Sequence, residues 1–293
     1  MNKLNEVLKK KNIKPIKYQK KSNVTIIETR EDKYVYKNTK IDQKVIEYLK
    51  SRNFDYIPLF LESKEFQLYK YIKALNIPDE KKILDLAKIM GLLHSKTTFY
   101  TMVDNDEYIK LYEDLDGNLN YLYNYYTDLI NVAESKVYPS PSEQLLSANI
   151  SIIYNTISDC KKRLEHYHHL IKNKTRKRNV IMHGNINLSH FIESEKPYLI
   201  SWDKAKIGSP VFDMYKLYRY HALDFDFISI LKKYESVYPF TKDEKVLFEI
   251  LISMPELINL KGSEYDRCII IDEMLEKIKR TKKIASPETS KER

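Results

Sequence analysis

The spacing of apolar residues changes near residue 75, and this change limits the possible folds more than any other feature of the sequence. Upstream, apolar and polar residues alternate at 23–29 and at 33–37, on either side of a charged turn, and two further β-like runs follow at 57–61 and 66–72. Alternating runs predict half-buried strands, and two such runs joined by a short turn predict a hairpin. We therefore expect a small sheet in the first 75 residues.

Helical spacing is present in both halves of the chain. A short basic amphipathic helix is expected at 4–11, and apolar positions between 41 and 49 predict one helix within the sheet region. From Pro78 onward helical spacing dominates, and capping-box signals at 140–143 and 241–244 each open a further helix, the first of them running to about residue 171.

These patterns predict an α+β chain with three parts. The first, residues 1–75, is a small N-terminal lobe of β-sheet with one helix, and the second, 76–281, is a larger and mainly helical lobe. The third, 282–293, is a polar tail that we expect to be frayed.

Two β-like runs, at 179–182 and 198–202, interrupt the helical region and flank a loop that begins with His183 and Gly184. The loop lies in the segment VIMHGNINLSHF at 180–191, and the second run opens the segment YLISWDKAKIGSPVFD at 198–213.

The first segment resembles the catalytic loop of aminoglycoside phosphotransferases, choline kinases and their spore-coat relatives, which reads apolar-apolar-H-G-D-x-x-x-x-N. The second is similar to the second motif of these families, I-D-[FW]-[DE]-x-A-x-x-G-x-P-x-x-D. Two motifs in the right order and with the right internal spacing are a specific signal. The resemblance covers residues from about 20 to about 260 and implies a protein-kinase-like bilobal fold.

Upstream residues agree with this resemblance. The segment LAKIMGLLH at 86–94 looks like the first helix of the families' larger lobe. Lys37 lies where the nucleotide-binding lysine would end a strand, and Glu47 lies on the following helix, where its ion-pair partner would be. Lys37 and Glu47 are therefore candidate nucleotide-binding residues, although two solvated side chains would explain them equally well.

The residues that carry the chemistry of these families are replaced in this chain. Phosphoryl transfer needs an anionic residue near the acceptor hydroxyl and oxygen ligands for Mg²⁺. The resemblance puts Asn185 at the first acid, His190 at the metal-binding Asn and Ser201 at the second acid. An amide does not accept a proton at neutral pH, and imidazole suits transition metals better than Mg²⁺. We expect no intact catalytic residue and no metal site.

Asp203 is the one residue that could replace the missing metal-binding acid. If the run at 198–202 continues as a strand, Asp203 points to the same side as Ser201, about 6 to 7 Å further along, and a metal could shift toward it. The families often carry an acid at this second position too, so ancestry explains Asp203 more simply than compensation does.

Other motif residues are retained, namely His183, Gly184, Gly208 and Asp213. In the fold that the resemblance implies, the loop His and the later Asp brace the backbone of the catalytic loop. These four residues are therefore interpreted as a structural motif that is retained although the catalytic residues are replaced.

Glycine usage argues against a nucleotide cofactor. The chain has only 5 glycines, and none precedes Gly91, so a flexible glycine turn over the phosphates is missing. We expect no cofactor, with ATP and Mg²⁺ binding weak or absent.

The formal net charge of +9 and the basic run at 172–178 could attract nucleic acid, an acidic partner or a membrane surface. The run lacks interleaved aromatics and a known nucleic-acid module, so we interpret it as a solvated loop between a helix and a strand and do not expect nucleic-acid binding. No long apolar stretch or secretory signal is present, so we expect no membrane span and a cytoplasmic location. Cys160 and Cys268 are expected to be reduced, partly buried thiols.

Two further features were weighed as sites. His166, His168 and His169 could suggest a metal cluster, but helical spacing lets only two of them share a face, which favours an exposed helix. The tyrosine-rich stretch at 108–126 falls where relatives place acceptor-site helices, and it could stack on an aromatic ligand. Packing onto the helical lobe is the simpler interpretation.

Two functional hypotheses from different classes follow. The first is a catalytically inactive, kinase-like binding or regulatory scaffold, whose partner is another protein or an unidentified small molecule. The alternative is a weak or unconventional ATP-dependent phosphotransferase acting on a small hydroxyl- or amine-bearing molecule. Asn185, His190 and Ser201 favour the first.

Overall fold

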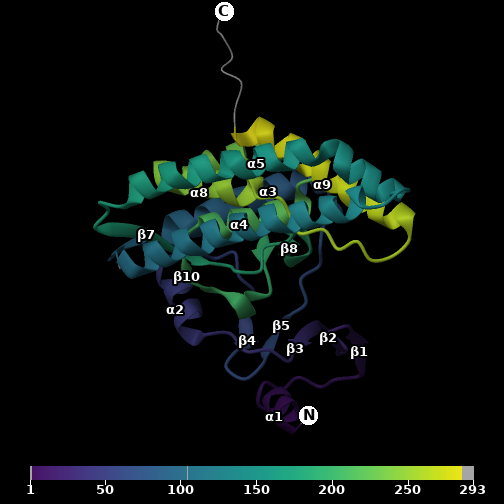
Figure 1. Ribbon diagram of the computed structural model, residues 1–293. Helices are drawn as coiled ribbons and strands as arrows, with labels where there is room; N and C mark the ends of the chain where they lie inside the picture. The colour runs from purple at the N-terminus through teal and green to yellow at the C-terminus, as the bar shows by residue number, and fades with distance from the viewer. Residues whose placement is uncertain (1, 104, 286–293) are drawn as a thin grey trace, which may run out of the picture. The chain divides into compact units, whose positions relative to one another are not determined.

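The computed structural model describes residues 2–103 and 105–285 (Figure 1). Its backbone contacts divide the chain into two compact units. The first comprises Met1–Phe99, Asn179–Lys216 and Ile230–Tyr238, and the second comprises Tyr100–Arg178, Leu217–Ser229 and Pro239–Arg293. Each unit is described separately below.

The first unit begins with a five-stranded antiparallel sheet. Its strands are β1 (Lys17–Lys21), β2 (Val24–Glu28), β3 (Lys33–Lys37), β4 (Phe60–Glu62) and β5 (Gln67–Lys70), in the order β1-β2-β3-β5-β4. Helix α2 (Gln43–Ser51) connects β3 to β4, and the Asp42 side chain caps it by accepting a hydrogen bond from Lys44 N. The predicted hairpin of β2 and β3 is confirmed, as is the α+β fold with a small sheet lobe and a larger helical one.

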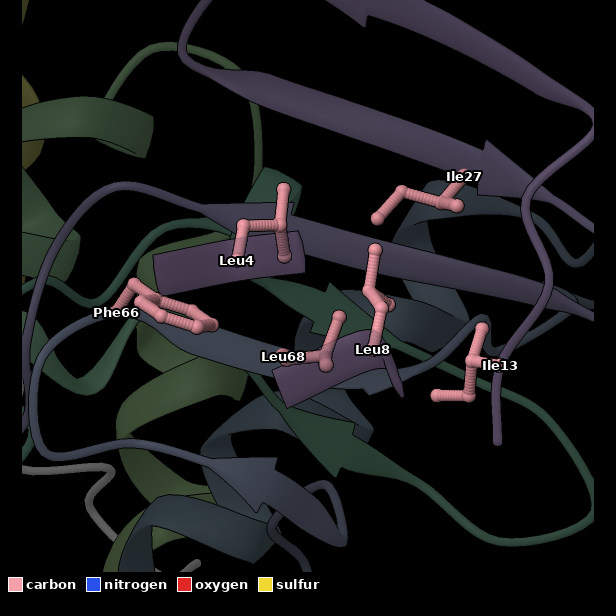
Figure 2. Packing of buried hydrophobic residues seen from close by; sticks show 6 residues of the cluster. All are labelled: Leu4, Leu8, Ile13, Ile27, Phe66 and Leu68. Carbon is pink, nitrogen blue, oxygen red and sulfur yellow. The ribbon is translucent and has the colours of Figure 1, made fainter. Parts of the chain in front are cut away.

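Helix α1 (Asn2–Lys10) covers one face of this sheet (Figure 2). Leu4 and Leu8 of α1 pack with side chains of β2, β5 and the flanking loops; the cluster comprises Leu4, Leu8, Ile13, Ile27, Phe66 and Leu68. Successive side chains of a strand point to opposite faces. Since Tyr36 packs against this cluster, the next residue, Lys37, lies on the opposite face.

The rest of the first unit surrounds the loop at 183–190. It contains α3 (Asp79–Thr97), the end of β7 (Arg176–Met182), η1 (Leu188–His190), β8 (Phe191–Ile192), β9 (Tyr198–Leu199), η2 (Trp202–Lys204), β10 (Lys206–Gly208), the start of α6 (Val211–His221) and the end of α7 (Phe227–Glu235). β10 pairs antiparallel with β7, and β8 pairs antiparallel with β9.

The strand predicted at 198–202 ends at Leu199, so its extension was wrong. Ser201 has φ 66°, in the left-handed region, and η2 begins directly after it. A left-handed residue reverses the local direction of the chain. The side chains of Ser201 and Asp203 therefore do not share a strand face, and the expected 6 to 7 Å offset along a strand does not apply.

The second unit is mainly helical. It contains most of β6 (Phe99–Met102), α4 (Asn105–Glu134), α5 (Pro141–Ile171), α8 (Lys242–Ser253) and α9 (Glu264–Ala285). α5 packs against α4, α8 and α9, and Figure 1 shows α4 and α5 as the long teal helices. The predicted capping boxes are confirmed at Ser140 with Glu143 and at Thr241 with Glu244.

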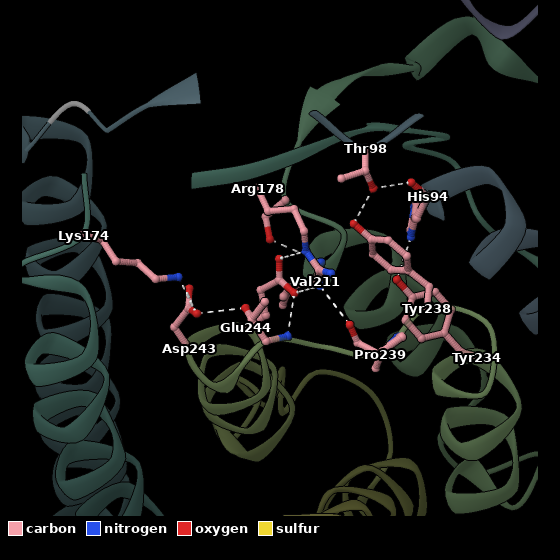
Figure 3. A network of polar contacts seen from close by, with 12 residues as sticks. His94, Thr98, Lys174, Arg178, Val211, Tyr234, Tyr238, Pro239, Asp243 and Glu244 are labelled. Atoms are coloured by element: carbon pink, nitrogen blue, oxygen red, sulfur yellow. Dashed lines mark hydrogen bonds and ion pairs between the residues drawn. The ribbon is translucent and has the colours of Figure 1, made fainter. Parts of the chain in front are cut away.

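The basic run at 172–178 was predicted as a solvated loop, and this is wrong for its second half. Residues from Arg176 onward form β7, which lies between β10 and β6 in a three-stranded sheet. Arg178 donates to both carboxylate oxygens of Glu244, and Lys174 pairs with Asp243 at 2.5 Å (Figure 3). Lys177 pairs with Glu107. Three of the basic residues of the run are therefore held by acidic residues of α4 and α8.

The tyrosine-rich stretch and the three histidines lie on helices, as predicted. On α4, Tyr126 is fully buried and its hydroxyl donates to Glu256 O, so part of the tyrosine stretch packs into the core, while Tyr121 and Tyr123 are exposed. His166, His168 and His169 are exposed on α5. Both cysteines are free, Cys160 being buried and Cys268 half-buried.

The remaining expectations concern the membrane and the tail. Among the described helices, none is long and apolar enough to cross a membrane. Of the predicted polar tail at 282–293, residues 282–285 continue α9, and the remainder lies outside the described residues.

Candidate functional site

The centre of the site is the buried carboxylate of Asp213, in the first turn of α6. Its Oδ2 accepts a hydrogen bond from His183 N at 2.7 Å, and its Oδ1 accepts one from Gly184 N at 2.9 Å. A third donor is His94 Nε2 on α3, at 3.3 Å from Oδ2. One carboxylate thus fixes two consecutive backbone amides of the loop and joins them to two helices.

The His94 ring is held on its other side as well. Its Nδ1 lies 2.7 Å from the Tyr234 hydroxyl of α7, which donates to it when Nε2 carries the proton toward Asp213 (Figure 3). Burial works to raise the pKa of the Asp213 carboxyl, but the hydrogen bond and charge of His94, with help from His183 and Gly184, hold that pKa below its usual range. Asp213 is therefore ionised and fully partnered.

His183 is a neutral structural side chain in this geometry. Its Nε2 donates to Ile200 O at 2.8 Å, so Nδ1 is free to accept from Asn185 N at 3.3 Å. The ring packs edge-on against Trp202, with 4.7 Å between centroids. Burial lowers the pKa of His183 to about 4, so both nitrogens keep these bonds at neutral pH.

Close backbone packing requires glycine at position 184. Gly184 has φ 69°, and a Cβ there would lie 2.1 Å from Lys204 O, so a side chain would collide with fixed backbone. At Gly208 a Cβ would meet only the end of the Met182 side chain, 2.7 Å from Cε, and that side chain can turn away. The predicted structural role therefore has a steric reason at Gly184.

Two of the three replaced residues, Asn185 and His190, lie on the loop itself, whereas Ser201 is buried just before η2. Asn185 and His190 are half-buried. His190 Nδ1 lies 2.7 Å from Asn185 O, so it must donate to that carbonyl. Among the described residues, the Asn185 side-chain amide has no hydrogen-bond partner. The His190 side chain thus bonds to the backbone of its own loop, five residues earlier.

Asp203 and Lys37 meet in a pair that the sequence did not predict. Lys37 Nζ lies 2.6 Å from Asp203 Oδ1, and both side chains are mostly shielded from solvent. Burial works to raise the pKa of Asp203, but the hydrogen bond and charge of Lys37 hold it below its usual range. The expected partner of Lys37 was Glu47, which is instead exposed on α2. The pairing of Lys37 with Glu47 was wrong.

The structure also brings in residues that the sequence analysis did not single out, namely His94, Lys216 and Tyr234. His94 ends the LAKIMGLLH segment, so a signal for it was present. Lys216 Nζ donates to Gly184 O at 2.6 Å. Nothing in the sequence pattern could have paired Tyr234 with His94, because they lie on helices 140 residues apart.

The side chains at the site do not fit the Mg²⁺ that the resemblance implies. In kinase sites one or two carboxylates hold Mg²⁺ together with substrate phosphates and waters. The two metal-binding positions carry His190 and Ser201, and His190 Nδ1 is turned to the backbone. Asp203 lies two residues after Ser201, and Lys37 already occupies one of its oxygens. Within the described ranges, no group of three or more His, Cys, Asp or Glu side chains could hold a metal ion.

Comparisons with known proteins find the fold but no relative in sequence. No protein-family model matches the chain, and no curated protein matches it either. An aminoglycoside phosphotransferase from Alicyclobacillus acidocaldarius superposes with a TM-score of 0.71 at 12% identity, over 94% of this chain and 92% of that one. The AMP-bound spectinomycin phosphotransferase gives 0.52 at 14% identity, over 99% of each chain. At such identities the shared feature is the kinase-like phosphotransferase fold.

Proposed function

We propose that this chain is a pseudokinase, a kinase-fold protein that does not transfer phosphoryl groups and acts in the cytoplasm as a binding or regulatory scaffold. The observation that carries the proposal is the 2.7 Å hydrogen bond from His190 Nδ1 to Asn185 O. It joins two positions at which the resembling enzymes have a metal ligand and a catalytic acid. The His190 side chain now maintains the shape of the loop, and the Asn185 amide side chain has no hydrogen-bond partner among the described residues.

The large catalytic contributions of the replaced residues in active enzymes support this proposal. General acid–base catalysis contributes about 10²- to 10⁴-fold, or roughly 3 to 5 kcal/mol of barrier. Asn185 supplies none of it, because its amide does not accept a proton at neutral pH. The loss of metal ligands at His190 and Ser201 adds to the barrier, since phosphoryl transfer depends mainly on electrostatic stabilisation.

One observation favours the alternative, a weak phosphotransferase acting on a small hydroxyl-bearing molecule. Asp203 is ionised, shielded and 2.6 Å from Lys37 Nζ. This ionised carboxylate beside a lysine is the feature from which residual chemistry could start. Any such activity would depend on Asp203.

Enzyme assays separate the two functions. Purified protein should consume no ATP above background with an aminoglycoside, choline, a sugar or homoserine as acceptor, and Asp203→Ala should change nothing. Asp55→Ala, an exposed carboxylate of the same unit, is the matched control. Robust turnover that Asp203→Ala abolishes and Asp55→Ala leaves intact would replace the pseudokinase proposal with the alternative.

Calorimetry tests the cofactor separately from turnover. Titration with ATP alone and with ATP plus Mg²⁺ should give weak or no binding and no gain from the metal. The triple variant Asn185→Asp, His190→Asn, Ser201→Asp restores the motif. If the backbone of the site still has the geometry of the enzymes, ATP binding by this variant should become dependent on Mg²⁺. A strong dependence on Mg²⁺ in the wild type would count against the proposal.

A further inference from the structure

The positive charge of the chain is concentrated in α1, β1 and the loop between them. Residues 3–21 contain eight lysines and one glutamate, so this segment has a formal charge of +7, out of +9 for the whole chain. Among the described residues, only the first of these lysines, Lys3, takes part in an ion pair, with Glu65 at 2.7 Å. The other seven, from Lys9 to Lys21, are exposed. We call residues 9–21 the basic edge, because β1 is the outermost strand of its sheet.

Backbone bonds and buried side chains hold the basic edge against the sheet. Helix α1 ends in a Schellman motif, in which Asn12 has φ 54° and the Ile13 amide donates to Leu8 O at 2.8 Å. Leu8 and Ile13 pack into the hydrophobic cluster (Figure 2). Ile16 N then donates to Glu28 O at 2.8 Å and leads the chain into β1. The lysines are therefore presented to solvent from an ordered part of the fold.

The basic edge differs from the basic run at 172–178 in its surroundings. Acidic residues of α4 and α8 hold three side chains of that run. At the basic edge, Glu28 is the register partner of Lys17, but its carboxylate is already bonded to Lys33 at 2.6 Å. The surplus charge of the chain is therefore available to an anionic partner at the basic edge.

The residue types at the basic edge indicate which kind of anionic partner fits. Its basic residues are all lysines, whereas arginine is the residue enriched at protein interfaces and suited to bidentate binding of carboxylates and phosphates. Two large apolar side chains lie among these lysines, Ile16 and Tyr18, at 64% and 48% exposure. Tyrosine and aliphatic side chains flanked by lysines suit the boundary between lipid headgroups and acyl chains.

We propose that the basic edge binds this protein to the surface of a membrane that contains anionic lipids. Each lysine near such a surface strengthens binding by about fivefold. Ile16 and Tyr18 add contact with the headgroup region, and no segment needs to cross the bilayer. Anionic lipids are found in the cytoplasmic leaflet, in agreement with the proposed location.

This inference goes beyond the proposed function, because it concerns where the protein binds and uses no residue of the loop at 183–190. ATP turnover would overturn the pseudokinase proposal and leave the membrane site unchanged. Absence of membrane binding would overturn the membrane site and leave the inactivity proposal unchanged.

Co-sedimentation of the full-length protein with vesicles tests the membrane site. Vesicles of phosphatidylserine and phosphatidylcholine in equal parts should bind the protein, and vesicles of phosphatidylcholine alone should not. Binding should fall steeply in about 1 M NaCl, where the Debye length is about 3 Å.

A variant with four substitutions in the basic edge tests the lysines without touching the packed core. It combines Lys14→Gln, Lys17→Gln, Lys20→Gln and Lys21→Gln. At about fivefold for each lysine, it should weaken vesicle binding by at least about 100-fold. Urea melts should show the stability of the wild type, because all four side chains are exposed.

The matched control removes the same number of positive charges from exposed sites elsewhere on the chain. It combines Lys110→Gln, Lys232→Gln, Lys233→Gln and Lys245→Gln. Its net charge equals that of the basic-edge variant, yet vesicle binding should change less than about threefold, because screening limits the contribution of distant charges.

A double variant, Ile16→Thr with Tyr18→Thr, tests the apolar contact separately from the charge. It keeps every lysine and a β-branched side chain at both positions. Vesicle binding should weaken, while its dependence on NaCl stays that of the wild type. Unchanged binding would show that the basic edge recognises charge alone, and would overturn the assignment of a lipid surface.

Three further results would overturn the proposal. One is equal weakening by the basic-edge variant and the matched control, which would show only a general attraction of a basic protein. Another is equal binding to vesicles with and without phosphatidylserine. The third is tighter binding to an oligothymidylate or to polyglutamate than to the vesicles, which would assign the basic edge to a nucleic acid or to an acidic protein.

Discussion

The inner side of the loop at 183–190 differs from its outer side in how much each residue is constrained. On the inner side, His94, His183 and Asp213 are at most 1% exposed, and each polar atom described above has a partner. On the outer side, Asn185 and His190 are half-buried; Asn185 bonds only through its backbone, to the His183 ring and to His190 Nδ1. The inner residues match the motif of the phosphotransferases, and the outer ones do not.

The difference shows what each side requires. Removing one member of a buried hydrogen-bonded set leaves its partners unsatisfied, at a cost of about 1 to 3 kcal/mol for each neutral group and more for charged ones. An outward side chain with few partners can change at little cost to folding. Retention of His183 and Asp213 therefore reflects stability, and it does not by itself indicate catalysis.

Asp213→Ala should produce the largest effect. It removes a buried carboxylate that accepts from His183 N, Gly184 N and His94 Nε2. We expect a loss of about 3 to 5 kcal/mol in the free energy of unfolding, measured by urea denaturation.

The matched control is Asp203→Ala, which removes another ion-paired carboxylate, one that is 18% exposed. Its loss should be clearly smaller, at about 1 kcal/mol, because water can replace part of the interaction with Lys37. Equal losses in the two variants would mean that the inner side is not specially constrained.

The free energy of unfolding should depend on pH in a way that reveals whether His183 is neutral in the folded protein. Its folded-state pKa is about 4, against 6.5 for an unperturbed histidine. Below pH 6.5 the unfolded chain takes up a proton that the folded chain refuses, so this contribution is complete above pH 6.5 and is lost as pH falls toward 4. The total loss is about 3 kcal/mol.

Asp213, whose pKa is lowered from 3.8, affects only the acid end of this window, because its contribution begins to be lost below about pH 5. This loss is common to the wild type and the control. The control is His183→Gln, which keeps an amide donor toward Ile200 O but does not titrate. Urea melts between pH 7 and pH 4 should give a flatter profile for the variant than for the wild type. Identical slopes would show that His183 is not held neutral.

The parts of this picture that the sequence predicted are those set by local signals. The β2–β3 hairpin and the capping boxes at Ser140 and Thr241 depend on residues within a few positions of one another. The two loop motifs contain most of the residues of the candidate site, and the fold they implied agrees with that of solved phosphotransferases.

The parts that the sequence did not predict depend on distant partners. Lys37 pairs with Asp203, 166 positions away, and no local pattern separates this partner from Glu47. The left-handed backbone at Ser201 could not be foreseen either, because serine gives a weaker signal for positive φ than Asn, Asp or Gly does. The segment at 176–178 looked like a loop because the acidic partners of Lys177 and Arg178 lie on other helices, far away in the sequence.

Asn185→Ala should have the smallest effect. The backbone groups of Asn185 that bond to His183 and His190 remain in the alanine variant. Its amide side chain is half-buried and has no partner among the described residues. We expect a change within about 0.5 kcal/mol of wild type in urea melts.

The inner reference for this variant is His183→Ala, which leaves Ile200 O and Asn185 N without their partner and opens a space beside Trp202. It should cost about 1 to 3 kcal/mol, between Asp213→Ala and Asn185→Ala. If Asn185→Ala instead proved the most destabilising of the three, Asn185 would be a structural residue. The outer side of the loop would then be as constrained as the inner side, and the former catalytic position would no longer be free to meet a ligand.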